Sequence, residues 1–166
     1  MDHERTLDLT DRAILQILQA NARTSNAAIA RRLEMAPSAV LERIRKLEAR
    51  GIVAGYAAHL SPAAVGFGLA AFIFVRAEEP VGAGAVGHRL AQIPEVLEVH
   101  HIAGEDCYLV KVRVADTEAV GRLLRDAIGT IPQVRSTRTT IVLSTVKEGT
   151  CLPLAAVAGN EETSHG

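Results

Sequence analysis

Apolar residues in the first third of the chain recur every three or four positions, which is the spacing of an amphipathic helix. Thr10 and Ser25 are the expected N-caps of the first two helices, because their hydroxyls accept from free backbone N–H groups. Pro37 suits the first turn of a third helix, which Gly51 is expected to end. The predicted buried stripes are Ala13, Ile14, Ile17 and Leu18; Ile29, Ala30 and Leu33; and Val40, Leu41, Ile44 and Leu47.

Beyond residue 51 the pattern changes from helical spacing to short apolar runs between turn residues. Ile52–Leu60 is expected to be a connecting strand that Ser61-Pro62 ends. Asp116 or Thr117 is expected to cap a later helix. The predicted elements are strands at 69–76, 96–103, 108–114 and 134–146, and helices at 84–92 and from about 117 to 128.

A short internal repeat organises this second half. Ile93-Pro94-Glu95-Val96 and Ile131-Pro132-Gln133-Val134 each follow a predicted helix and open a predicted strand. Two such units in tandem give β-α-β-β-α-β, the ferredoxin-like arrangement of four antiparallel strands with two helices on one face. Apolar residues fall on both faces of Leu69–Val75 and of Ile141–Leu143, so the uncovered face of the sheet is expected to meet another subunit.

These elements predict an α+β protein in which a strand joins two domains. The expected divisions are a three-helix, winged-helix-like helix-turn-helix domain at 1–52, a linker strand at 53–68, a ferredoxin-like domain at 69–150 and a tail at 151–166 that is mobile at its end.

Composition narrows the class of protein. Of the 166 residues, 48% are hydrophobic and 22% are charged, which is typical of a globular chain. No apolar run is long enough for a membrane span, and the charged N-terminus is unlike a secretory signal. Two cysteines make no disulfide framework, so the expected compartment is a reducing cytoplasm.

The distribution of charge is more informative than the net charge of −1. From Arg23 to Arg50 there are seven basic and three acidic residues, whereas from Ser61 onward there are nine basic and twelve acidic. A basic patch on an otherwise acidic chain is the footprint that contact with DNA phosphates requires.

The predicted third helix is the candidate for that contact. Its outward positions would place serine, arginine and lysine where they can enter a major groove and hydrogen-bond base edges and phosphates. An ordinary helical hairpin with a solvated basic face would show the same pattern. The candidate DNA-binding residues are Ser38, Glu42, Arg43, Arg45 and Lys46.

The turn Gly104-Glu105-Asp106-Cys107-Tyr108 is the second candidate site. It could form a ligand pocket, a metal site or simply a polar hairpin turn. Strand alternation sends His100 and His101 to opposite faces, so no metal is expected. No catalytic motif or phosphate-binding glycine loop is present, and the neighbouring acids disfavour a Cys107 thiolate. We therefore expect neither an enzyme nor a cofactor.

The ordered motifs resemble one family over about residues 7–148. They are Leu9-Thr10-Asp11-Arg12-Ala13-Ile14-Leu15, Asn21-Ala22-Arg23, Ile29-Ala30-Arg31-Arg32-Leu33, Pro37-Ser38-Ala39-Val40, Arg43 to Glu48, Gly51-Ile52-Val53, Gly104 to Val114 and Arg138 to Lys147. They look like the Lrp/AsnC transcriptional regulators. The resemblance implies double-stranded DNA as partner, a homodimer or higher even-numbered oligomer, and a small-molecule effector, commonly an amino acid. An architectural DNA-binding protein without an effector is the alternative.

On this resemblance the effector would bind near the Gly104 turn, where an acidic side chain can pair with a ligand ammonium group. Two residues depart from the family pattern. Ala36 replaces the usual serine before the third helix, and Cys107 replaces a frequent aspartate, so either Asp106 takes over or selectivity shifts to less polar ligands. The candidate effector residues are Gly104, Glu105, Asp106 and Tyr108, with Thr140, Val142 and Ser144 from a neighbouring subunit.

Overall fold

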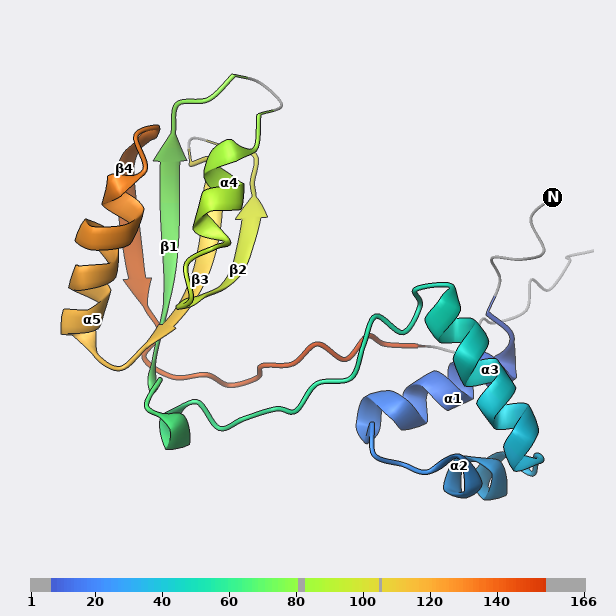
Figure 1. The fold of residues 1–166 in the computed structure, drawn as a ribbon. Helices are drawn as coiled ribbons and strands as arrows, with labels where there is room; N and C mark the ends of the chain where they lie inside the picture. The colour runs from blue at the N-terminus through green and yellow to red at the C-terminus, as the bar shows by residue number, and fades with distance from the viewer. Residues whose placement is uncertain (1–6, 81–82, 105, 155–166) are drawn as a thin grey trace, which may run out of the picture. The chain divides into compact units, whose positions relative to one another are not determined.

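A computed structural model of the chain describes residues 7–80, 83–104 and 106–154 (Figure 1). The chain divides into two compact units. One unit contains the described residues up to Ala58 together with those from Glu148 onward, and the other runs from His59 to Lys147. The first unit is helical and the second contains a sheet with helices, which is the α+β organisation that the sequence predicts.

The described part of the first unit contains α1 (Leu9–Ala20), α2 (Asn26–Leu33) and α3 (Pro37–Ala49), as predicted. One face of each helix enters a common apolar core, because the apolar residues recur at helical spacing. The buried members of this core are Ile14, Leu15, Leu18, Ile29, Ala30, Val40, Ile44 and Leu47.

The start of α1 differs from the prediction. Asp8, rather than Thr10, is the N-cap, and its carboxylate accepts a hydrogen bond of 2.7 Å from the backbone N–H of Asp11. An ionised cap also interacts favourably with the helix dipole, which a hydroxyl does less strongly. The helix therefore begins at Leu9.

The other helix ends follow the sequence signals. Ser25 caps α2 by accepting from the N–H of Ala28. Ala36 precedes α3 and makes no side-chain cap, as its methyl group dictates. Gly51 follows the C-cap of α3 with a φ of 68°, a left-handed conformation that glycine adopts without strain.

The second unit contains an antiparallel sheet of strand order β2-β3-β1-β4, with α4 and α5 on one face (Figure 1). This confirms the ferredoxin-like prediction. The two Ile-Pro repeats make the same turn, in which the N–H of Val96 or Val134 donates to the isoleucine carbonyl three residues earlier at 3.0 Å. The elements are β1 (Leu69–Ala77), α4 (Ala85–Leu90), β2 (Val96–His101), β3 (Tyr108–Val114), α5 (Thr117–Arg122) and β4 (Val134–Ile141).

Three element boundaries differ from the prediction. Residues 52–60 form no strand, because nothing in the described chain pairs with them. The last strand stops at Ile141, opposite Ala71, although the N–H of Val142 still donates to the carbonyl of Ala70 at 3.0 Å. Helix α4 is shorter than predicted, whereas Asp116 caps α5 as expected. A wider π-helical turn at Leu123–Ala127 and a tighter 3-10 turn at Ile128–Thr130 continue α5.

The sheet has one buried face and one open face. Alternate residues of β1 and β3, including Ile73, Val75 and Val110, pack beneath α4 and α5. Their neighbours Phe72 and Phe74 lie on the opposite face, which none of the unit's described helices covers, and they remain partly exposed.

The C-terminal segment returns to the helical unit. The backbone N–H of Leu152 donates to the side-chain amide of Gln19 at 2.7 Å, and Gln16 donates to the carbonyl of Leu154 at 2.6 Å. The first residues of the predicted tail are therefore held against α1. The predicted mobile end, residues 155–166, lies outside the described residues.

Candidate functional site

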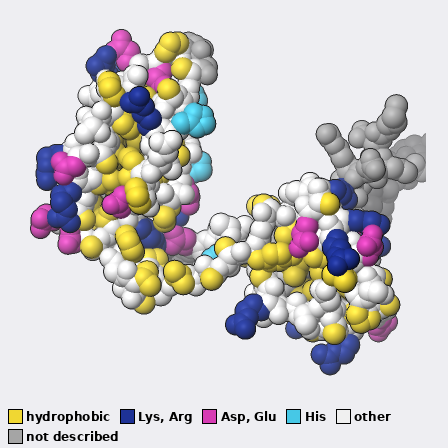
Figure 2. Space-filling view, viewed as in Figure 1, with side chains coloured by type: hydrophobic (Ala, Val, Ile, Leu, Met, Phe, Trp, Pro, Cys, Tyr) yellow, Lys and Arg dark blue, Asp and Glu magenta, His cyan; other side chains and the backbone are white. Residues whose placement is uncertain are grey.

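Helix α3 presents a polar face to solvent. Val40, Ile44 and Leu47 are buried, and the opposite side of the helix carries the predicted outward row. Ser38, Glu42, Arg45 and Lys46 are all exposed, as the helical wheel requires. Figure 2 shows Lys, Arg, Asp and Glu side chains interspersed over this unit. The residues proposed from sequence therefore lie on one accessible surface, except for Arg43.

Arg43 lies at the edge of that surface and contacts α1. Its Nη1 donates to Oδ2 of Asp8 at 2.6 Å and to Oδ1 of Asp11 at 2.7 Å. The Asp11 side chain is 13% exposed, so this ion pair is partly shielded from water. The guanidinium therefore links α1 to α3. The sequence did not predict this link, because the partners lie 35 and 32 residues from Arg43 along the chain.

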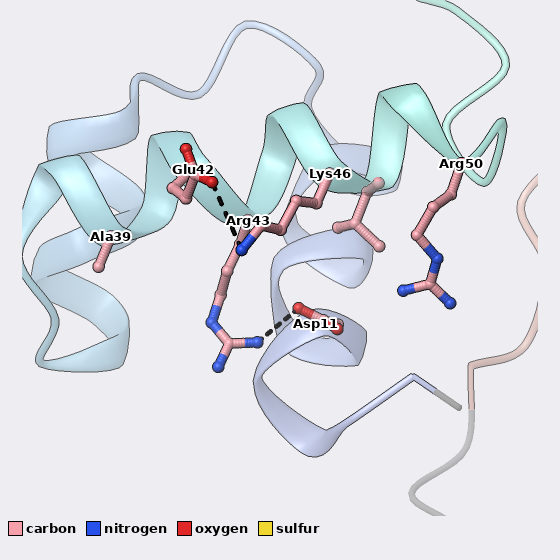
Figure 3. Close-up of a pocket in the computed structure, with 7 residues that line it drawn as sticks. Asp11, Ala39, Glu42, Arg43, Lys46 and Arg50 are labelled. Atoms are coloured by element: carbon pink, nitrogen blue, oxygen red, sulfur yellow. Dashed lines mark hydrogen bonds and ion pairs between the residues drawn. The ribbon is translucent and has the colours of Figure 1, made fainter. Parts of the chain in front are cut away.

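A cavity of about 340 Å³ opens between α1 and α3 beside Arg43 (Figure 3). The Lys46 ammonium lies 3.4 Å from the Glu42 carboxylate, its neighbour one helical turn away. Arg50 extends from the same side of α3 and is exposed. Residues lining the cavity are Asp11, Ala39, Glu42, Arg43, Lys46, Leu47 and Arg50.

The Gly104 turn joins β2 to β3. Gly104 has a φ of 137°, which residues other than glycine rarely adopt. Apart from its two chain neighbours, no described residue has an atom within 4 Å of the position that a Cβ would take. Glu105 lies outside the described residues. Asp106 accepts from Nη2 of Arg138 at 2.9 Å, and the Arg138 guanidinium lies 4.0 Å above the ring of Phe74. Sequence reasoning missed Arg138 because only the pairing of β1 with β4 brings it to the turn.

Tyr108 is not at the surface of the turn. Its side chain is 3% exposed and belongs to the core beneath the helices, and its hydroxyl donates to Glu79 at 2.7 Å. The position after the turn falls on the buried side of β3, which strand alternation fixes. The ring stacks on His101, whereas His100 lies on the other face beside Glu98, as predicted. Tyr108 therefore supports the sheet, and its contact with an effector stays a prediction.

The other effector candidates lie apart within one chain. Thr140 pairs with Phe72 and Val142 donates to the carbonyl of Ala70, towards the opposite end of β1 from the turn. Ser144 lies beyond the strand. One chain therefore does not bring these residues to Gly104, and their participation requires a neighbouring subunit.

The Cys107 thiol forms hydrogen bonds with the backbone beside the turn. Its thiol donates to the carbonyl of Ala77 at 3.2 Å and lies 3.4 Å from the N–H of the same residue. In the described part of the chain no three His, Cys, Asp or Glu side chains gather as a metal site would need. No helix there is long and apolar enough to cross a membrane.

Comparison with known proteins decides the family. Residues 7–54 match a winged helix-turn-helix DNA-binding domain, and residues 70–152 match the Lrp/AsnC ligand-binding domain. The chain belongs to the Lrp/AsnC family. A curated Lrp/AsnC relative, the LrpA transcriptional regulator of Mycobacterium tuberculosis, is 40% identical over 139 residues, covering 84% of this chain and 91% of that protein. A transcriptional regulator of Pyrococcus horikoshii is 38% identical over 151 residues, with 89% and 97% covered.

Solved Lrp/AsnC structures agree with this fold. A transcriptional regulator of Neisseria meningitidis in complex with L-methionine has a TM-score of 0.84 at 37% identity, covering 90% of this chain and 97% of that one. A feast or famine regulatory protein of M. tuberculosis complexed with L-methionine has a TM-score of 0.79 at 39% identity, with 86% and 96% covered. The protein is accordingly a DNA-binding transcriptional regulator with a ligand-binding domain.

Proposed function

We propose that this Lrp/AsnC regulator binds operator DNA through the exposed face of α3, and that an amino-acid effector bound at the second unit changes its DNA binding or assembly. The observation on which this rests is the outward row of α3, which leaves Arg45 and Lys46 accessible while the apolar stripe is buried. Cations on a recognition helix contact phosphates and base edges in the major groove.

Within that face the roles differ by position. Ser38 and Glu42 lie in the N-terminal half of α3, the part of a recognition helix that comes nearest to base edges. Glu42 would accept from a cytosine amino group, and Ser38 would bond either a base or a phosphate. Arg45 and Lys46, one turn further along, would supply base and phosphate contacts.

The effector site is proposed at the Gly104 turn. The open space around Gly104 lets a ligand approach the backbone, and Asp106 would pair with its ammonium group in place of Arg138. The methionine complexes of the two relatives support an amino acid, and they suit a less polar ligand beside Cys107. Thr140, Val142 and Ser144 would complete the site from a neighbouring subunit.

The active form is proposed to be a homodimer or a higher even-numbered oligomer acting in the cytoplasm. The open face of the sheet carries Phe72, Phe74 and Leu109, and no helix among the described residues of its own unit covers them. A second copy would cover this face and place two α3 helices for two half-sites of one operator.

The DNA contact is tested by replacing Lys46 with alanine. Affinity for a DNA fragment selected by binding from a random-sequence pool would be measured against salt concentration. Loss of one phosphate contact should flatten the slope of log affinity against log salt by about 0.9 per subunit and weaken binding to all sequences. Arg122→Ala, on α5 of the other unit, is the matched control. An unchanged affinity and slope for Lys46→Ala would remove α3 from the interface.

The effector is tested by a thermal-shift screen against the twenty amino acids, since a ligand that binds the folded state raises the melting temperature. Gly104→Val should abolish the shift and leave DNA binding without ligand largely intact. A shift that persists in this variant would place the site elsewhere. If no amino acid moves the melting temperature of the parent protein, the architectural alternative without an effector is favoured.

A further inference from the structure

We propose that the cations lining the cavity between α1 and α3 have separate roles: Arg43 positions the recognition helix, and Arg50 together with Lys46 receives one phosphate of the DNA backbone. The proposal rests on the function proposed above, in which α3 meets DNA. It changes the role expected for Arg43 and adds Arg50 to the interface. It derives from how the charges around the cavity are paired (Figure 3).

One end of the cavity carries net negative charge. The Arg43 guanidinium is shared by the carboxylates of Asp8 and Asp11 at 2.6 and 2.7 Å, so the three groups together carry one negative charge. A phosphate brought to Arg43 would meet two carboxylates. Moving the guanidinium to the phosphate would leave the poorly exposed Asp11 carboxylate without its partner, which is unfavourable.

At the other end of the cavity, two cations are available to bind a phosphate. Lys46 is paired with Glu42 by an exposed contact of 3.4 Å between successive helical turns, a kind of ion pair that contributes little and exchanges easily. Arg50 has no ion-pair partner among the described residues and is exposed. Its guanidinium suits a phosphate because two parallel N–H groups match two phosphate oxygens.

Arg43 is placed to control the orientation of α3. It lies halfway along the helix, and Asp8, one of its partners, is also the cap at which α1 begins. Its two ion pairs therefore join the middle of α3 to the first turn of α1. Small rotations of α3 would move Ser38 and Glu42 away from base edges while leaving long cationic side chains within reach of phosphates, so Arg43 should act on sequence discrimination.

The proposal is tested with the full-length variants Arg43→Gln and Arg50→Gln, measured over a salt series on selected DNA and on random-sequence DNA. Arg50→Gln should flatten the salt slope by about 0.9 per subunit and weaken both DNAs alike. Arg43→Gln should keep the parent slope and lose specificity, with the affinity ratio falling roughly tenfold, the size of one lost base contact. Arg122→Gln is the control for charge outside the helical unit.

Three further measurements distinguish positioning from simple loss of stability. Melting temperatures verify that each variant is folded at the assay temperature. Arg43→Lys should restore specificity only in part, because one ammonium cannot hold both carboxylates as a guanidinium does. Asp11→Asn, which keeps the Arg43 charge and loosens its attachment, should also lower specificity at an unchanged slope.

Three results would overturn the roles proposed for Arg43 and Arg50. If Arg43→Gln flattens the salt slope as much as Arg50→Gln does, Arg43 is itself a phosphate ligand. The same conclusion would follow if Asp11→Asn tightened DNA binding and made the salt slope steeper. If Arg50→Gln leaves the salt slope unchanged while Lys46→Ala flattens it, Arg50 does not contact a phosphate and the proposal is wrong. Unchanged slopes in all of these variants, Lys46→Ala included, would overturn the proposed function itself.

Discussion

Asp8 combines two interactions at the scale of a single residue. Its carboxylate caps α1 and pairs with Arg43 on α3. The hydrogen bond from the backbone N–H of Asp11 lowers the pKa of Asp8 below its ordinary value, and Arg43 lowers it further. Since folding favours the ionised form, Asp8 stabilises the folded state above the unfolded pKa. This contribution is lost as the pH falls through the lower, folded pKa.

Replacing Asp8 with asparagine should separate the charge from the cap. Asparagine still accepts from the Asp11 N–H, so the variant should lose only the ionic part of the stability at pH 7. The free energies of unfolding of parent and variant should converge as the pH falls below about 4, near the ordinary value of 3.8. Asp8→Ala should lose about 1 kcal/mol more, because the cap is absent. Denaturant titrations across pH measure this, and a gap that widens in acid would contradict it.

At the scale of elements, α4 packs closely on β3 in the ligand-binding domain. A Cβ at Gly87 of α4 would lie 2.8 Å from Cε1 of Tyr108. The tyrosine ring is buried and its hydroxyl is bonded to Glu79, which in turn accepts from the N–H of Val86 at the start of α4. The ring therefore has little freedom to move away.

Gly87→Ala should destabilise the protein by about 1–3 kcal/mol, because overpacking outweighs the better helix propensity of alanine. Gly121→Ala in α5 is the matched control, since its Cβ would meet only the flexible end of Arg125 at 3.3 Å. That variant should be neutral or more stable by up to about 1 kcal/mol. Thermal unfolding of the two variants side by side makes the comparison, and equal effects would mean that α4 shifts freely on the sheet.

At the scale of the whole molecule, the open face of the sheet predicts association. It exposes aromatic and aliphatic side chains that a soluble monomer would ordinarily cover. Light scattering at micromolar concentration should give at least twice the mass of the 17.7 kDa chain. Phe72→Asp should shift the mass towards a single chain, whereas Val65→Asp, an exposed apolar position outside the sheet, should not. A parent protein that scatters as one chain would refute the prediction.

Short-range information determined much of the architecture from sequence alone. The buried stripes of α1, α2 and α3 follow from helical spacing, and the two Ile-Pro turns follow from their own residues. The outward row of α3 is a consequence of the same spacing. These features depend on residues within a few positions of one another, so the amino-acid sequence alone is enough to predict them.

Only the tertiary structure decided which distant groups meet. Arg43 pairs with α1 across more than thirty positions, and Arg138 reaches Asp106 across 32. Which face of β3 is buried, and with it the Tyr108 ring, was set by the helices α4 and α5 that cover one side of the sheet. Residues 52–60 have strand-forming character yet form no strand without a partner. Ion pairs and β-ladders require a second group at a defined place in space, and periodicity along a sequence does not specify that place.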